Sequence, residues 1–226
     1  MRNNQRRLGP ARSPKSSSPA PAVADLAFAV PTEFVELPSR GEFYSEDHPL
    51  HKQETVEIRF MTAKEEDILS SKPLLKKGLA LERFLESLLV LDIDPKTLFI
   101  GDRNAILIAS RISGYGSEYN FTHSCTKCFV PGEVDFDLND ASFTGKCFDE
   151  EFLHEEKIFY NRDTATLDIV LPASGVTVGV VPIDCLAEKK LFSDNKNTEN
   201  SPITSVLSSF IVKANDEADY NYVIQF

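Results

Sequence analysis

Long hydrophobic runs are missing from this sequence, and none approaches the ~18 apolar residues that a helix needs to cross a bilayer. The longest apolar stretch, around residues 85–93, is interrupted by Glu86, Ser87 and Asp92. The N-terminal region also lacks the compact apolar core of a secretory signal peptide. The sequence therefore predicts a protein without a membrane span.

Cysteine is scarce, with four in 226 residues. In a chain without a secretion signal, this number predicts free thiols in a reducing compartment rather than disulfides. Cys147 and Cys185 have no partner at metal-ligand spacing, so we expect each to be a small, semi-buried apolar residue. Cys125 and Cys128 are different, because they form a C-x-x-C pair.

Motifs of catalytic chemistry are also missing. The chain contains neither of the glycine loops that bind nucleotide phosphates, no H-E-x-x-H and no G-x-S-x-G. The glycines of "GYGSEY" (114–119) follow an expected helix, which makes them a poor phosphate cradle. Runs of acidic residues such as "KEED" and "HEEK" are typical of solvated faces. We therefore expect no enzymatic activity.

Positive charge is scarce outside the N-terminus. Residues 1–24 carry a charge of +5, and the whole chain has a formal charge of −11, so the remainder carries −16. Nucleic-acid binding depends on Lys and Arg side chains that neutralise phosphates. We therefore expect no direct contact with nucleic acid and a protein that binds other proteins.

The domain organisation follows from composition. Residues 1–25 are rich in Ser, Pro and Ala and have almost no large apolar side chain, so we expect residues 1–30 to form a disordered basic tail. Residues 31–226 are expected to form the folded domain, and two lobes of about 31–116 and 117–226 are an open alternative. The apolar ending "DYNYVIQF" leads us to expect that it packs somewhere or that the natural chain continues.

The first part of the domain predicts a strand followed by helices. Val56, Ile58 and Phe60 alternate with charged residues, which predicts a strand with one buried face. Thr62, three residues before Glu65, forms the pattern of a capping box and predicts a helix start.

Two further helices are expected before residue 117. In "GLALERFLESLLVLD" one apolar face is expected to hold Leu81, Phe84, Leu85 and Leu88. In "GDRNAILIASRISGYG" we expect Asp102 as the cap, Gly114 as the left-handed C-terminal residue, and burial nearly all round from Ala105 to Ala109.

The second part predicts mainly strands. Val134, Phe136 and Leu138 alternate with acidic residues, and Leu167–Leu171 and Val176–Val180 alternate on either side of a "PASG" turn. Helical spacing returns in "ITSVLSSFIVKA" (202–214 region), through Ile203, Val206, Leu207 and Phe210. The fold class expected is α+β, with antiparallel strand hairpins packed with a few helices and a zinc-ribbon-like C-x-x-C knuckle.

The C-x-x-C pair is the one candidate metal site. Two thiolates separated by two residues can bind one Zn²⁺ from a tight turn, but structural zinc needs four ligands. Cys125 and Cys128 would therefore be an incomplete site, and His123 lies at an unusual spacing for the same metal. The site could be completed by Cys147, His154 or Cys185 through folding, completed by residues beyond this chain, or not exist as more than a hairpin turn. A thioredoxin-like redox pair needs a helix after the first cysteine, and Pro131-Gly132 disfavours one.

Four segments of the chain are long and unusual when taken together. They are "LPSRGEFYSEDHPLHKQETVEIRFMTAKEEDIL", "KKGLALERFLESLL", "LFIGDRNAILIASRISGYGSEY" and the C-x-x-C that follows. From about Phe34 to Cys128, in the same order and spacing, they resemble one protein family, the baseplate hub assembly proteins of T4-like (T-even-type) contractile-tailed bacteriophages.

The resemblance implies a structural or assembly component of the tail baseplate hub, which acts by binding other hub and tail proteins. It implies assembly in the cytoplasm of the infected host and leaves open whether the protein stays in the virion tail baseplate. In the family the first C-x-x-C usually lies in a C-P-x-C-G setting, and a second such motif lies near the C-terminus. This chain has Phe129 in place of the turn glycine and lacks the second motif.

The candidate binding surfaces are the "LPSRGEFY" turn (37–44) and the Arg111–Tyr119 loop that leads to the C-x-x-C. The alternative function is a zinc-ribbon module that contacts nucleic acid or a transcription complex, and a redox enzyme is a third reading.

Overall fold

A computed structural model describes residues 30–140, 147–194, 206–207, 209–215 and 217. Every described residue except Val30 belongs to the unit Pro31–Phe226. The tail expected at residues 1–30, apart from Val30, and the apolar ending of the chain lie outside the described residues.

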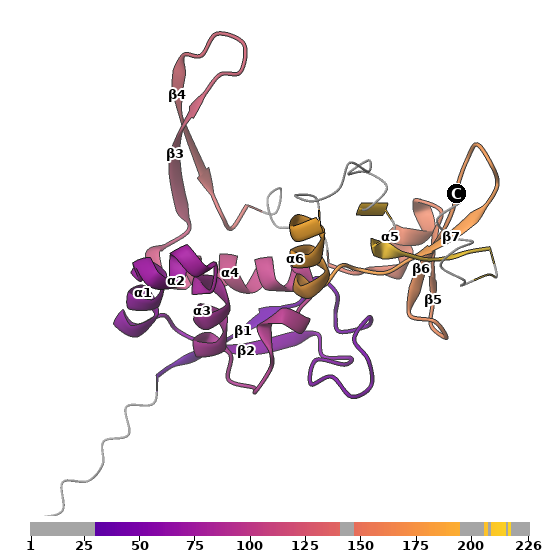
Figure 1. Cartoon of the computed structure of the whole chain (residues 1–226), viewed down its shortest axis with the longest axis horizontal. Helices are drawn as coiled ribbons and strands as arrows, with labels where there is room; N and C mark the ends of the chain where they lie inside the picture. Colours follow the sequence, from indigo (N-terminus) through magenta and orange to yellow (C-terminus); the bar gives the residue numbers. More distant parts are fainter. Residues whose placement is uncertain (1–29, 141–146, 195–205, 208, 216, 218–226) are drawn as a thin grey trace, which may run out of the picture. The chain divides into compact units, whose positions relative to one another are not determined.

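The domain alternates helices with antiparallel hairpins, which confirms the α+β class (Figure 1). The strands are β1 Thr32–Glu36, β2 Thr55–Arg59, β3 Glu118–Ser124, β4 Pro131–Asp137, β5 Ile158–Asn161, β6 Thr166–Val170, β7 Thr177–Val180 and β8 Ile211–Ala214. The helices are α1 Ala63–Ser70, α2 Lys72–Lys77, α3 Ala80–Leu88, the 3₁₀ helix η1 Pro95–Thr97, α4 Ile100–Tyr115, α5 Glu150–Glu155 and α6 Cys185–Asp194.

Within the described residues, the strands form three antiparallel sheets. β1 pairs with β2, β3 pairs with β4, and the third sheet has the order β5-β6-β7-β8. The predicted hairpin of residues 167–180 is confirmed as β6 and β7. The helical spacing expected through Ile203, Val206, Leu207 and Phe210 is confirmed at Val206, Leu207 and Phe210, which are helical, and is wrong for Ile211–Ala214, which pairs with β7 as a strand. Ile203 itself lies outside the described residues. At Ile211–Ala214, pairing with β7, more than thirty residues away in the sequence, outweighs the local helical spacing of apolar residues.

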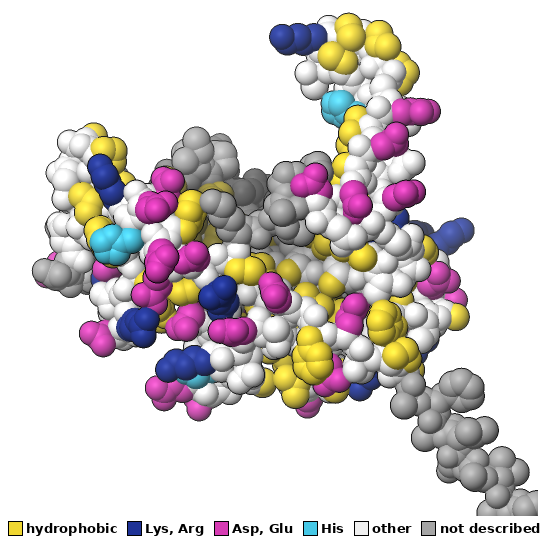
Figure 2. All heavy atoms as spheres, turned by 180° about the vertical axis from the view of Figure 1, so that it is seen from behind, with side chains coloured by type: hydrophobic (Ala, Val, Ile, Leu, Met, Phe, Trp, Pro, Cys, Tyr) yellow, Lys and Arg dark blue, Asp and Glu magenta, His cyan; other side chains and the backbone are white. Residues whose placement is uncertain are grey.

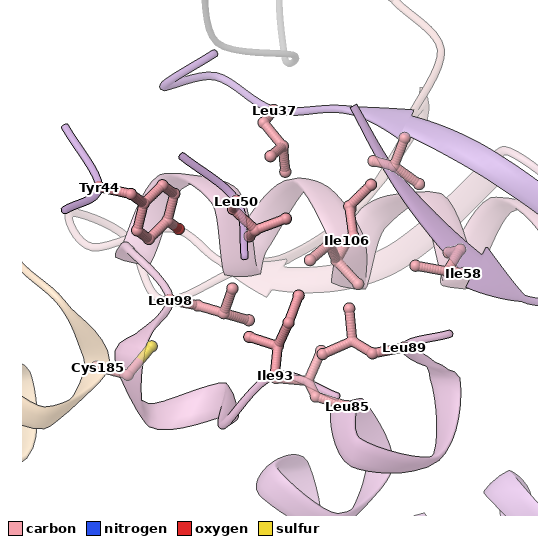
Figure 3. Packing of buried hydrophobic residues seen from close by; sticks show 12 residues of the cluster. Leu37, Tyr44, Leu50, Ile58, Leu85, Leu89, Ile93, Leu98, Ile106 and Cys185 are labelled. Atoms are coloured by element: carbon pink, nitrogen blue, oxygen red, sulfur yellow. The ribbon is translucent and has the colours of Figure 1, made fainter. Parts of the chain in front are cut away.

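One apolar cluster joins β1, β2, α3 and α4 (Figure 3). Val56 and Ile58 of β2 point into it, as their alternation with charged residues predicts, and Ile106 of α4 is fully buried. Cys185 at the start of α6 reaches the same cluster, and its backbone N–H donates to the carbonyl oxygen of Leu98 at 3.0 Å. The expectation that Cys185 acts as a buried apolar residue is confirmed.

The capping box at Thr62 is confirmed. Thr62 is the N-cap of α1, and its backbone N–H donates to the Glu65 carboxylate at 2.9 Å. Glu65 also accepts from the Ser87 hydroxyl of α3 at 2.5 Å. The same side chain therefore starts α1 and ties it to α3.

The buried face of α3 differs from the expected one at a single position. Phe84, Leu85 and Leu88 are buried as predicted, but Leu81 is 50% exposed and Ala80 is buried in its place. Ala80, Phe84 and Leu88 lie on one i, i+4, i+8 row, and on the neighbouring row Leu85 is buried while Leu81, one turn earlier, is exposed. Helical spacing places Leu81 and Leu85 on one face, so it could not show that only one of them is covered.

Three expectations about α4 are wrong. The N-cap is Phe99, and Asp102 lies inside the first turn, fully buried. Gly114 is helical, and the residue with positive φ at the C-terminal cap is Gly116, with φ 84°. Ala105 and Ala109 are only half-buried, so one face of the helix is in the core rather than the whole circumference.

Within the part of the chain that the structure describes, no helix combines the length and apolar composition that a membrane span requires.

Candidate functional site

The hairpin of β3 and β4, residues 118–137 with their turn, is the most exposed regular element of the domain. Every residue of β3 is exposed, and Phe136 is the one residue of β4 that is not. A two-stranded hairpin by itself is marginally stable in water. Among the described residues, β3 and β4 pair only with each other, and most of their side chains are not covered by another sheet or helix.

The register divides the hairpin into two chemically different faces. Tyr119 is opposite Phe136 and Phe121 is opposite Val134, so these four side chains share one face. The other face has Glu118 opposite Asp137, Asn120 opposite Asp135, and Thr122 opposite Glu133. This is the alternation of a strand pair with one buried face, but here Tyr119, Phe121 and Val134 on that face stay exposed.

Aromatic rings cluster on the apolar face. The Tyr119 and Phe136 ring centroids are 5.3 Å apart, and the Phe121 ring is 5.9 Å from Phe136. Tyr119, Phe121 and Val134 nevertheless remain 41%, 40% and 40% exposed. Figure 2 shows hydrophobic side chains along one side of the hairpin and acidic side chains along the other. Exposed apolar patches rimmed by polar residues mark interaction surfaces.

The polar face carries negative charge only. Its charged members are Glu118, Glu133, Asp135 and Asp137. Glu118 and Asp137 lie directly opposite one another, an arrangement that destabilises a strand pair. The backbone N–H of Asn139, at 2.9 Å, and then the Ser117 hydroxyl lower the pKa of Asp137, so this carboxylate keeps its charge to lower pH. A cationic partner would relieve the repulsion.

Arg111 at the end of α4 holds the base of the hairpin. Its guanidinium donates to the Gly116 carbonyl oxygen at 2.7 Å and lies 5.0 Å from the Tyr115 ring and 5.7 Å from the Tyr119 ring. The Arg111–Tyr119 loop is therefore the structural support of the hairpin, and the apolar face begins where it ends.

Cys125 and Cys128 lie in the turn of the hairpin. The turn is closed by two backbone bonds, from Cys125 N–H to the Val130 carbonyl oxygen at 3.0 Å and from Phe129 N–H to the Cys125 carbonyl oxygen at 2.8 Å. Backbone N–H groups of Cys128 and Lys127, followed by the Cys128 side chain, hydrogen-bond to the Cys125 sulfur and lower its pKa. The turn thus favours a thiolate at Cys125.

Phe129, which follows Cys128 in the turn, has a left-handed backbone. Phe129 has φ 57° and is 78% exposed. A bulky residue in this region is uncommon and strained, because its Cβ approaches the backbone. The side chain is therefore kept at a position where glycine would be more stable.

The structure does not bring the other candidate ligands to this turn. Among the described residues, no group of three or more His, Cys, Asp or Glu side chains is placed to hold a metal. Cys185 is in the main core, Cys147 is half-buried, and the His154 ring packs edge-on against Phe159 at 4.9 Å. The turn and its strands match the expectation, but the zinc-ribbon part of the expected fold finds no support within the described chain.

The "LPSRGEFY" turn, expected as a binding surface, is largely interior. Leu37, Ser39 and Tyr44 are buried. Ser39 donates to the Asp102 carboxylate through its backbone N–H at 3.0 Å and its hydroxyl at 2.6 Å, and the Tyr44 hydroxyl donates to the same carboxylate at 2.8 Å. Burial, and then the Asp102 charge, raise the pKa of Tyr44, so the phenol stays neutral and can donate. Hydrogen bonds to Asp102 therefore hold residues 37–44, which we call the latch, against α4. Local sequence patterns do not predict this long-range contact.

The alkylation rate of each cysteine should follow the exposure and the pKa of its thiol. We expect Cys125 and Cys128 to be alkylated by iodoacetamide at least about tenfold faster than Cys185 near pH 7, because the thiolate is the nucleophile. Burial raises the pKa of Cys185 and of Cys147, whereas the pKa of Cys125 is lowered. Lowering the pH from about 9 to 7 should widen the ratio of Cys125 to Cys185 labelling, since the thiol of higher pKa protonates first.

Mass spectrometry of digests taken at successive times would measure the four rates. In urea the rates should converge. Native Cys185 labelled as fast as Cys125 would contradict the placement of both residues.

Comparison with known proteins found one family. The family model described as "T4 bacteriophage base plate protein" matches residues 31–219. No curated protein matches the chain, and no solved structure matches it either.

Proposed function

Because this chain belongs to the T4 bacteriophage base plate protein family, we propose that it is a structural or assembly component of the baseplate hub and binds its neighbours through the apolar face of the β3–β4 hairpin. Family membership makes it a baseplate structural component of the virion tail, with other phage tail proteins as its partners. The hub as its location, assembly in the host cytoplasm, and the hairpin as the contact surface belong to the proposal.

The observation that carries the proposal is the exposure of Tyr119, Phe121 and Val134 on one face of the hairpin. Aromatic side chains are enriched at the centres of protein interfaces, where they exclude water and dominate the binding energy. A hairpin that exposes two of them, and whose strands pair only with each other within the described chain, can pack this face against another protein. A structural role of this kind also fits a chain whose sequence predicts no catalytic site.

The acidic face indicates the chemistry of the partner. Glu133, Asp135 and Glu118 lie on the opposite face of the strand pair from the aromatic side chains. A partner that packs on the apolar face and reaches the other face with Lys or Arg would satisfy both, and such charge complementarity speeds association and fixes register. The same carboxylates disfavour the alternative of nucleic-acid binding, and the absence of direct nucleic-acid contact stays a prediction.

Replacing both Tyr119 and Phe121 by serine should weaken binding to the hairpin's partner by at least about tenfold, because interface aromatics typically contribute more than 1 kcal/mol each. The measurement is biolayer interferometry of the purified chain against each of the other baseplate proteins of the same phage. Leu81→Ser is the matched control, since Leu81 is equally apolar and 50% exposed on α3. Circular dichroism would check that all variants remain folded.

Equal affinity of the double variant and the parent for a partner that the parent binds would overturn the hairpin as the contact surface. A loss of affinity with Leu81→Ser of the same size would point to α3 or to a general loss of structure.

A further inference from the structure

We propose that the hairpin turn is half of a metal site: Cys125 and Cys128 bind one Zn²⁺ together with the same two cysteines of a second copy of this chain, so that a tetrathiolate site joins two hairpin tips. This goes beyond the proposed function, which uses the aromatic face of the strands rather than the turn.

The first step is the preorganised pair. Zn²⁺ is bound by thiolates, and two cysteines separated by two residues in a tight turn can supply two of them. The backbone bonds between Cys125, Phe129 and Val130 fix the turn, and N–H groups from Cys128 and Lys127 stabilise the Cys125 thiolate. Hydrogen bonds of this kind to a ligand atom orient it and hold its charge.

The second step is that this chain offers no third soft ligand. All four cysteines and all four histidines lie among the described residues. Cys185 is buried in the core, and Cys147 lies beside Pro38 and Asp102. None of these side chains forms a three-ligand group with the pair within the described chain.

The histidines also contact other groups or lie outside any group of ligands with the cysteine pair. His48 hydrogen-bonds to the Thr97 hydroxyl at 2.9 Å, and His51 to the Tyr44 carbonyl oxygen at 2.7 Å. His154 packs against Phe159. His123 is on β3 opposite Gly132 and is not part of a three-ligand group. Structural zinc takes four protein ligands, and the described residues place no third ligand in a group with the pair. We assign the other two ligands to a second copy, because a two-fold dimer is the simplest closed arrangement.

The third step is the surface around the pair, which suits contact between two tips. Phe129 and Val130 are 78% and 61% exposed, and two-fold contact would bury them against their counterparts. Lys127 is the one charged residue between Cys125 and Gly132, while the carboxylates begin at Glu133. Figure 2 shows hydrophobic and basic side chains at the end of the hairpin, with acidic ones along its side. Two tips can therefore approach without opposing carboxylates, although the chain as a whole is acidic.

The left-handed Phe129 fits the same arrangement. Glycine would relieve the backbone strain at φ 57°, yet glycine would also remove the apolar side chain nearest Cys128. A strained, exposed aromatic residue beside the pair is accounted for if it is buried in the dimer.

Zinc binding releases the protons of the four cysteine thiols. Each of the four thiols loses its proton to solvent and donates an electron pair to Zn²⁺, so four protons leave for each ion bound and no oxidant or reductant is needed. Zinc affinity should therefore fall as the pH falls.

The test is to add Zn²⁺ to the reduced full-length chain, dialyse against a mild chelator, and measure zinc by elemental analysis and mass by sedimentation equilibrium. We expect one zinc per two chains and a mass twice that of the 25.2 kDa monomer, with return to monomer in EDTA. Co²⁺ in place of Zn²⁺ should give the thiolate-to-metal charge-transfer absorption of a four-sulfur tetrahedral site.

Cys125→Ser and Cys128→Ser should each abolish zinc retention and the dimer, while Cys147→Ser, the matched control outside the turn, should leave both unchanged. Phe129→Gly should keep the zinc stoichiometry and weaken the dimer. One zinc per monomeric chain, zinc retained in Cys128→Ser, or no zinc retained by the parent would each overturn the proposal.

These outcomes can be separated from failure of the proposed function. The cysteine variants keep Tyr119 and Phe121, so their affinity for a baseplate partner can be measured independently. A missing zinc site with intact partner binding would remove this inference alone.

Discussion

Replacing Asp102 by alanine is expected to lower the free energy of unfolding by about 3–5 kcal/mol, the largest effect of any single polar substitution in the described chain. The Asp102 carboxylate is fully buried and accepts from the Ser39 N–H, the Ser39 hydroxyl and the Tyr44 hydroxyl. Alanine would leave these buried donors without their acceptor, and each unsatisfied donor costs about 1–3 kcal/mol. The latch of residues 37–44 on α4 would open.

Chemical denaturation followed by circular dichroism would measure this loss. Asp94→Ala is the matched control: Asp94 accepts from the Lys96 N–H at 3.0 Å, but the bond is exposed, so a loss of about 1 kcal/mol is expected. Asp102→Asn should fall between the two, because it keeps one accepting oxygen. A loss for Asp102→Ala no greater than that for Asp94→Ala would show that the latch is dispensable.

The second large effect concerns two leucines of α3. Leu88→Ala should destabilise the protein by about 2–5 kcal/mol, because Leu88 is fully buried and its truncation leaves a cavity. Leu81→Ala, the same change seven residues earlier, should cost no more than about 0.5 kcal/mol, because Leu81 is 50% exposed.

Urea melts of both variants under one set of conditions would give the difference. Similar losses at the two positions would mean that Leu81 is covered in solution, for example by a partner or a second copy.

The candidate site was only partly predictable. The alternation of Val134 and Phe136 with acidic residues predicts a strand, and β4 is there. The same alternation normally implies a buried face, and that inference is wrong for this hairpin because Tyr119, Phe121 and Val134 remain exposed. A period-2 pattern shows that one face is apolar, but it does not show what covers that face.

The "LPSRGEFY" turn shows the opposite error. Its polar and aromatic residues suggested a surface, yet Ser39 and Tyr44 are buried against Asp102. Asp102 lies 63 positions after Ser39 and 58 positions after Tyr44, so local sequence patterns do not reveal the hydrogen bonds that make the burial possible. Asp102 was assigned as a helix cap for the same reason, because the local pattern offered a short-range role.

The sequence by itself determined the elements whose signals are local. The capping box at Thr62, the β2 alternation of Val56 and Ile58, and the β6–β7 hairpin each depend on neighbours within a few residues, where propensity and turn chemistry act directly. Only the tertiary structure decided which apolar faces are covered, that Leu81 is outside the core, and that Tyr119, Phe121 and Val134 of the β3–β4 hairpin stay exposed. Burial depends on packing between segments far apart in the chain, and that is a property of the assembled fold rather than of any stretch of sequence.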